Sequence, residues 1–126
     1  MNTYGDIPLL DQEQIDMLID AGGDSARELF NDLERLFVEE TGPRLLVIED
    51  ALKTGQLIPI AKQVHAIAGA SANLGGMRLS AACKAIERKI LDEPTVSVGI
   101  IAAMTEDLKA LFETTIRALH EKILKM

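Results

Sequence analysis

The chain has 126 residues and a formal net charge of −7, and 48% of its residues are hydrophobic while only 3% are aromatic. This length and composition suit one globular domain, and a core poor in aromatic residues favours helices over strands. The acidic balance argues against nucleic acid or an anionic membrane as the main partner. The longest apolar stretch, VGIIAAM, is too short to cross a bilayer, which needs about 20 residues.

The small numbers of cysteines and histidines limit the kinds of covalent link and metal site that the chain can form. Cys83 is the lone cysteine, which excludes an internal disulfide, fits a reducing compartment and is typical of a core position. The N-terminal MNTYGDIPLL lacks the basic and apolar segments of a signal peptide, so we expect a cytoplasmic protein. The two histidines and the cysteine lie far apart in sequence without a recognised metal spacing, and we expect neither a metal site nor a cofactor.

The apolar pattern is helical from the first capping signal onwards. Asp11 is the N-cap candidate of a short first helix, with Gln14 at capping-box spacing, and Gly22-Gly23 ends it. The second helix follows the cap candidates Asp24 and Ser25, and its expected buried positions repeat at helical intervals: Leu29, Phe30, Leu33, Leu36, Phe37, Leu45, Ile48 and Leu52. We expect Pro43 to kink or restart this helix, with Thr41 as a new N-cap.

Three further helices complete the pattern. We expect these helices at about Leu57 to Asn73, Met77 to Leu91 and Ser97 to Leu124. They are preceded in turn by Gly55, by Gly75-Gly76 and by the segment DEP, which contain residues that end helices. No segment shows sustained period-two alternation. The sequence therefore predicts an all-α fold, an antiparallel up-down four-helix bundle with a short additional N-terminal helix. We expect one domain over residues 1–126, with a cap segment and short helix over 1–23 and the bundle over 24–126.

His65 has an unusual setting in the third helix. The expected core stripe of that helix is Ile60, Val64, Ile67, Ser71 and Leu74. Because His65 lies about 100° from Val64 around the helix, we expect it at the flank of the core, under little side-chain cover. Gly69, one turn on, costs a helix about 1 kcal/mol relative to alanine, which suggests close approach by another molecule. An uncharged, accessible imidazole can act as a nucleophile toward phosphorus.

The segment VHAIAGASANLGGMRLSAACKAIE resembles the active-helix motif of histidine-containing phosphotransfer (HPt) domains. That motif has His, two residues, Lys-Gly, two small residues, two more, then an aliphatic residue and Gly, followed by a helix with Leu, small or Cys, and aliphatic positions. The matching positions are His65, Gly69, Ala70, Ser71, Leu74, Gly75, Leu79, Cys83 and Ile86. The resemblance covers roughly residues 24–91.

The resemblance implies that His65 accepts a phosphoryl group from the aspartate of one response-regulator receiver domain and passes it to another. The receiver, with its own Mg²⁺, supplies most of the chemistry, and a hybrid sensor histidine kinase is a further possible partner. Nothing in the sequence resembles an ATP-binding domain, so we expect no autonomous kinase activity. Ala68 stands where the family has lysine, and we expect Lys62, Lys84 or Arg88 to offset the phosphate charge instead.

Other interpretations remain open at this stage. The docking surface around His65 is expected to be bordered by Lys62, Ala68, Gly69, Ala72, Lys84 and Arg88. The absence of the family's lysine at position 68 favours a docking or regulatory module that carries no phosphate. A helical oligomerisation domain should expose a large apolar patch, which the stripes do not predict, so we expect a monomer. His120 has no comparable setting and is expected to be solvated.

Overall fold

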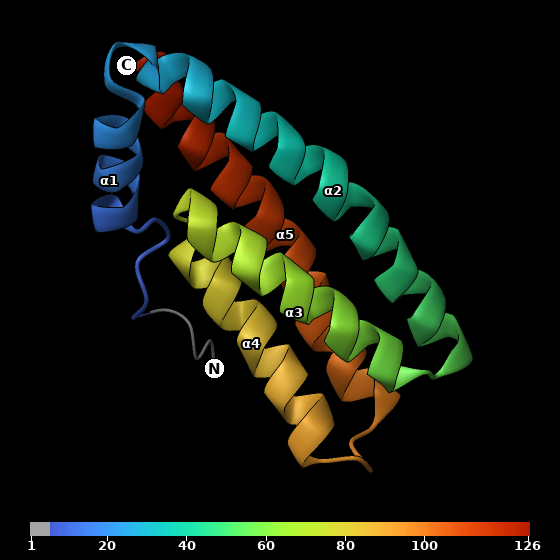
Figure 1. Cartoon of the computed structure of the whole chain (residues 1–126). Helices are drawn as coiled ribbons and strands as arrows, with labels where there is room; N and C mark the ends of the chain where they lie inside the picture. Colours follow the sequence, from blue (N-terminus) through green and yellow to red (C-terminus); the bar gives the residue numbers. More distant parts are fainter. Residues whose placement is uncertain (1–5) are drawn as a thin grey trace.

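The computed structural model describes residues 6–126. Residues 1–5 of the expected N-terminal cap segment lie outside the described residues. The described residues form five α-helices and one short 3-10 turn (Figure 1): α1 Gln12–Gly22, η1 Gly23–Ser25, α2 Ala26–Thr54, α3 Leu57–Leu74, α4 Met77–Asp92 and α5 Val98–Leu124. The helices α2 to α5 alternate in direction, and both α3 and α5 pack against α2 and α4. The all-α bundle with an additional N-terminal helix is therefore confirmed. Along residues 6–126, no helix is long and apolar enough to cross a membrane.

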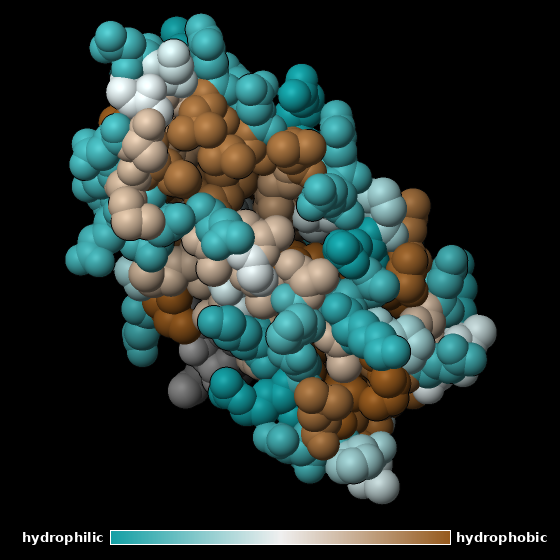
Figure 2. Space-filling view, viewed as in Figure 1, coloured by the Kyte–Doolittle hydropathy of each residue, from teal (hydrophilic) through white to brown (hydrophobic). Residues whose placement is uncertain are grey.

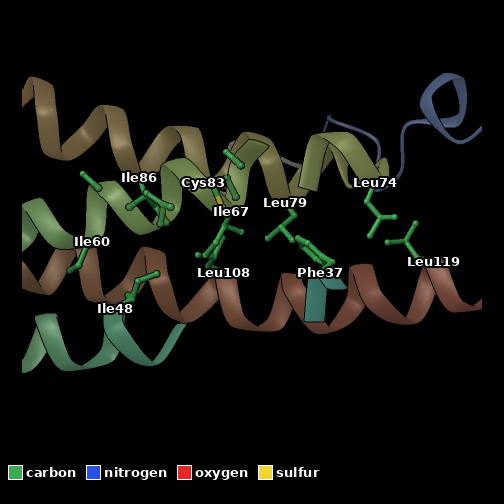
Figure 3. Packing of buried hydrophobic residues seen from close by; sticks show 14 of the residues in the cluster. Phe37, Ile48, Ile60, Ile67, Leu74, Leu79, Cys83, Ile86, Leu108 and Leu119 are labelled. Atoms are coloured by element: carbon green, nitrogen blue, oxygen red, sulfur yellow. The ribbon is translucent and has the colours of Figure 1, made fainter. Parts of the chain in front are cut away.

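The core runs along the axis between the four long helices (Figure 3). All five positions of the stripe predicted for α3 are buried. In α2 the buried face is carried by Phe30, Phe37, Thr41 and Ile48, and the prediction that Leu36 belongs to the core is wrong, since it is 46% exposed. Leu36 lies about 100° around the helix from its buried neighbour, which places it at the rim of the stripe.

Helix α2 continues through Pro43 without a break, so the expected restart with Thr41 as N-cap is wrong. Thr41 is a buried interior position of the helix. The residue before a proline normally resists helical geometry because its Cβ meets the proline ring. Gly42 has no Cβ, which removes one part of that conflict.

The N-terminal capping of two helices, α1 and α2, also differs from the prediction. Asp11 caps α1 as predicted, its carboxylate accepting the Gln14 backbone N–H, but the Gln14 side chain donates to the Asn73 carbonyl instead of closing a capping box. Ser25 stands at the N-cap position of α2 without a side-chain capping bond, because the 3-10 turn leads directly into the helix. Ser97, by contrast, caps α5 by accepting the Ile100 N–H.

The N-terminal segment is tied to the turn between α3 and α4. The Asp11 N–H donates to the Gly75 carbonyl at 2.8 Å, and Arg78 Nε donates to the Ile7 carbonyl at 2.8 Å. Gly75 has a φ of 94°, and a Cβ there would lie 2.9 Å from Ile15 Cγ1, so this turn requires glycine for both conformation and space. The segment therefore holds the end of the α3–α4 pair together.

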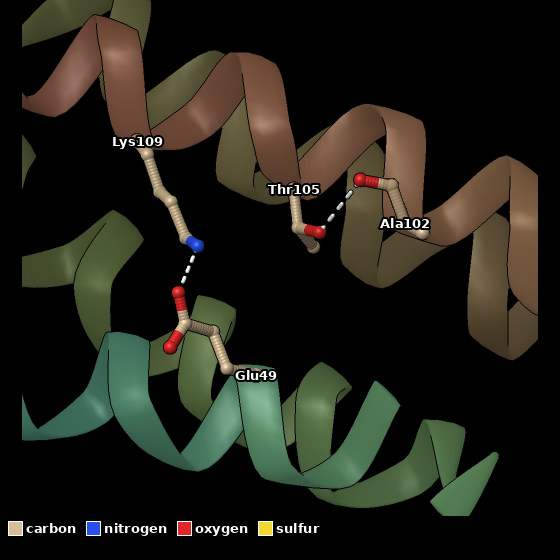
Figure 4. Close-up of polar contacts among 4 residues, drawn as sticks. All are labelled: Glu49, Ala102, Thr105 and Lys109. Carbon is tan, nitrogen blue, oxygen red and sulfur yellow. Dashed lines mark hydrogen bonds and ion pairs between the residues drawn. The ribbon is translucent and has the colours of Figure 1, made fainter. Parts of the chain in front are cut away.

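Helices α2 and α5 are joined by an ion pair between Glu49 and Lys109, with the Thr105 hydroxyl bonded to the Ala102 carbonyl one turn away (Figure 4). The hydrogen bond from the Lys109 ammonium lowers the pKa of Glu49, and the same bond raises the pKa of Lys109. On this side of the bundle the α2–α5 contact is thus partly electrostatic.

Candidate functional site

His65 lies on α3 at the flank of the buried stripe, as the periodicity predicts, and 75% of its side chain is exposed. Its Nδ1 atom is 2.8 Å from Oε2 of Glu87, which lies on α4 and whose side chain is only 25% exposed. An ionised carboxylate can only accept a hydrogen bond, so Nδ1 must donate. In a neutral imidazole the other ring nitrogen, Nε2, then carries the lone pair. The Glu87 contact therefore orients the ring and leaves Nε2 for an incoming group.

Two hollows meet at His65. One of about 510 Å³ lies along α3 and α4, and the other, of about 340 Å³, lies toward the start of α3. His65, Glu87 and Leu91 line both. Lys84 and Arg88 from α4 reach the first hollow, while Lys62 from α3 reaches the second. Glu87 lines both hollows and Asp92 lines the first, so these cations share the site with two carboxylates. An anion bound at Nε2 would have cationic side chains on either side, and charge-assisted hydrogen bonds from them suit phosphate.

Gly69 is open to solvent beside the histidine. It lines the first hollow, and a Cβ built on it would meet nothing within 4 Å. Ala68, its neighbour, is 3% exposed, and its carbonyl accepts a 2.9 Å bond from the Ser80 hydroxyl of α4. Position 68 therefore forms the floor of the hollow and helps to join α3 to α4.

The other predicted site residues fall into two groups. The structure brings Lys62, Gly69, Lys84 and Arg88 to the two hollows around His65. Ala72 is exposed but lines a third hollow, of about 270 Å³, that Ile7 and Lys84 also line and His65 does not. Ala72 thus borders the site from the side of the N-terminal segment.

Sequence reasoning missed Glu87. It lies three residues after Lys84 and one before Arg88, so helical spacing places all three on one face of α4. That spacing could have added Glu87 to the site. Its pairing with His65 also depends on the register between α3 and α4, which the periodicity of either helix alone does not contain.

The remaining titratable candidates lie elsewhere. The side chain of His120 on α5 is 55% exposed, as expected, yet its Nδ1 lies 3.4 Å from Oε2 of Glu34 on α2, a partner the sequence did not predict. Cys83 is buried in the core, and burial raises the pKa of its thiol to about 12, so it is no nucleophile near neutral pH. Among the described residues, no group of three or more His, Cys, Asp or Glu side chains is placed to hold a metal ion.

A four-helix bundle that presents an exposed histidine between two hollows, with Lys62, Lys84 and Arg88 among the side chains that line them, has the features of a phosphohistidine carrier. The family model of the Hpt domain matches residues 24–120, and the chain belongs to this family. The crystal structure of histidine-containing phosphotransfer protein B (HptB) from Pseudomonas aeruginosa PAO1 is similar in fold, with a TM-score of 0.78, 21% sequence identity, and coverage of 95% of this chain and 98% of that chain. No curated protein matches the sequence.

Membership of the family gives the general role. Hpt domains are phosphocarrier modules of phosphorelays, they interact with receiver domains, and they are not kinases. The chain therefore has a phosphotransfer role in a phosphorelay.

Proposed function

We propose that His65 is the phosphoacceptor of this chain, and that it takes a phosphoryl group from the phosphoaspartate of one receiver domain and delivers it to the aspartate of another. The observation that carries the proposal is the Glu87 contact on Nδ1, which leaves Nε2 as the nucleophile in an exposed hollow. In this proposal the chain is a single domain that works as a monomer in the cytoplasm, with a hybrid sensor histidine kinase as a possible source of the phosphorylated receiver.

The transfer step balances without an external acid or base. The Nε2 lone pair forms a bond to phosphorus while the bond from phosphorus to the acyl oxygen of the receiver breaks, and the receiver's aspartate leaves as a carboxylate. The proton on Nδ1 stays in place, so the ring becomes cationic, and the Glu87 carboxylate offsets that charge. In the onward step a receiver carboxylate attacks phosphorus, the P–N bond breaks, and its electrons return to Nε2.

Charge compensation comes from cations that are not at position 68. Lys84 and Arg88 line the same hollow as the histidine, and a guanidinium can hold two phosphoryl oxygens at once. Lys62 approaches from the opposite side. The receiver would bring its own Mg²⁺ to the other oxygens. These cations favour a carrier over the second candidate, a docking module without phosphate, which the missing lysine alone supports.

The acceptor can be tested with phosphoramidate, a small donor that phosphorylates histidine without a receiver. Intact mass under non-acidic conditions is compared for the wild type, His65→Gln and the matched control His120→Gln. One phosphoryl adduct that is lost only in His65→Gln supports the proposal. An adduct that persists in His65→Gln overturns the proposal in favour of another acceptor residue. A wild type that folds by circular dichroism and takes no phosphate overturns it in favour of the docking module.

The charge assignment is tested by transfer from a radiolabelled phospho-receiver. Lys84→Met and Arg88→Met each keep a long aliphatic chain and remove the charge, and each should slow transfer roughly tenfold. Lys62→Met serves as the comparison from the other side of the ring. Equal rates for all three variants and the wild type would refute the idea that these cations replace the family's lysine.

A further inference from the structure

Lys84 lies between two of the hollows on the α3–α4 face. It lines the first hollow, of about 510 Å³, together with His65, and the third hollow, of about 270 Å³, together with Asp11. Figure 2 shows hydrophilic residues along the middle of α4, and Lys84 is exposed. The ion pairs formed among residues 6–126 do not include Lys84. Its flexible side chain is therefore not committed to either hollow.

We infer that Lys84 is shared between these two hollows, and that Asp11 of the N-terminal segment competes for its ammonium with a phosphoryl group on His65. This inference rests on the proposed function. It makes Asp11 a positioning residue, which acts on the phosphoryl group through Lys84 without touching it. The N-terminal segment and the acceptor histidine are thereby coupled.

The first argument is the level at which Lys84 lies along α4. Glu87 is opposite His65, and Lys84 precedes Glu87 by three residues on the same face of the helix. Because α3 and α4 are antiparallel, Lys84 lies opposite the turn of α3 that follows His65, and Ala68 and Gly69 line the first hollow with it. This is the level at which the family's lysine would stand, so a cation here is placed to reach a phosphoryl group.

The second argument is the fixed position of Asp11. Its carboxylate accepts the Gln14 backbone N–H at 3.2 Å, and its own N–H donates to the Gly75 carbonyl at 2.8 Å. These bonds hold Asp11 against the turn between α3 and α4. The charged residues that line the third hollow are Asp11 and Lys84, which have opposite signs. An ammonium that turns toward this hollow therefore meets a carboxylate that cannot follow it away.

The third argument is the balance of charge between the hollows. Apart from Lys84 itself, the first hollow is lined by one cation, Arg88, and two carboxylates, Glu87 and Asp92, while the third is lined by the carboxylate of Asp11. With a neutral imidazole, each hollow thus offers Lys84 a surplus of one negative charge. A phosphoryl group on Nε2 adds negative charge and acceptor oxygens to the first hollow and draws the ammonium there. By reciprocity, loss of the Asp11 charge should favour phosphate at His65.

The test compares the rates at which phosphoramidate labels the wild type, Asp11→Asn, Lys84→Met and the double variant, followed by intact mass under non-acidic conditions. Asparagine caps a helix as well as aspartate does, so Asp11→Asn removes the charge and keeps the capping bond. Lys84→Arg, with and without Asp11→Asn, keeps a cation at position 84. Asp20→Asn is the matched control, since Asp20 is an exposed carboxylate of α1 that lines none of the three hollows.

Asp11→Asn should raise the labelling rate about twofold to threefold, which is the effect of a partly exposed ion pair, and Lys84→Met should lower the rate. In the Lys84→Met background Asp11→Asn should have no effect, because the cation for which it competes is gone. In the Lys84→Arg background the increase should return. Asp20→Asn should be labelled at the wild-type rate.

Three outcomes would overturn the competition for Lys84 and leave the proposed function intact. The first is a wild type labelled on His65 whose rate Asp11→Asn does not change. The second is an increase that persists with Lys84→Met, and the third is an equal increase in Asp20→Asn, because net charge alone would then explain the rates. A folded wild type that takes no phosphate on His65 overturns the proposed function itself, so the two failures are distinguishable.

Discussion

Replacing Gly69 by alanine should make the free domain more stable and the carrier worse. The residue lies in the interior of α3, and an added Cβ would meet nothing within 4 Å, so no internal clash opposes the change. Alanine in a helix interior is favoured over glycine by about 0.5–1 kcal/mol. For a chain of this size that gain corresponds to a rise in Tm of about 2–5 °C. The same methyl group would stand in the hollow beside His65, where under the proposed function the receiver brings its phosphoaspartate close to Nε2.

Two assays separate the two effects. Urea unfolding followed by circular dichroism gives the free energy of unfolding, and rapid-quench transfer from a labelled phospho-receiver gives the rate, which we expect to fall at least about tenfold since small misplacements of reacting groups are costly. Labelling by phosphoramidate, a much smaller donor, should change little. Gly99→Ala, also helical and also without a close contact to an added Cβ, is the control that should leave transfer unchanged. A Gly69→Ala variant that is more stable and transfers at the wild-type rate would refute the role of the glycine in approach.

Three further outcomes follow from the same contacts. Glu87→Gln should slow phosphate uptake about fivefold to tenfold, because a neutral amide offsets the developing ring cation less well than a carboxylate; an unchanged rate in rapid-quench assays would contradict this. Gly42→Ala should lower the free energy of unfolding in urea by about 1 kcal/mol, since a residue with a Cβ directly before a proline resists helical geometry and Pro43 lies inside α2; a gain in stability would contradict it. The lowered pKa of Glu49 beside Lys109 means that the ion pair stabilises the fold above the ordinary glutamate range and that this contribution disappears as pH falls through the lowered pKa. The stability difference between wild type and Glu49→Gln should therefore shrink in acid and in high salt, and a constant difference would show that the pair contributes nothing.

The helices could be predicted because their ends and faces are set locally. Asp11, Gly55 and Ser97 each end or begin a helix through contacts within a few residues, which is the range that a sequence pattern reports. The flank position of His65 follows from the same 3.6-residue period. Whether α2 continues through Pro43 also depends on neighbouring residues, and the prediction considered the proline without the glycine before it.

The contacts that complete the site are of a different kind. The Glu87 bond to His65 spans 22 residues, and the Arg78 bond to the Ile7 carbonyl spans 71. Each depends on how far one helix or segment is shifted along its neighbour, and that shift is decided by packing of the whole core. The face of α4 could therefore be predicted, while the residue opposite the histidine could not.

This difference bears on how the missing lysine at position 68 should be interpreted. In the family's pattern the cation and the histidine share one helix, so their spacing is visible in the sequence. Here Ala68 is covered, and its carbonyl is bonded to Ser80 of α4. Core packing sets α4 against α3, and that bond and the Glu87 contact join the two helices, so side chains of α4 line the same hollow as side chains of α3. A cation at the phosphate can therefore come from either helix, and a motif confined to one helix does not include the cations that α4 brings to the hollow, Lys84 and Arg88.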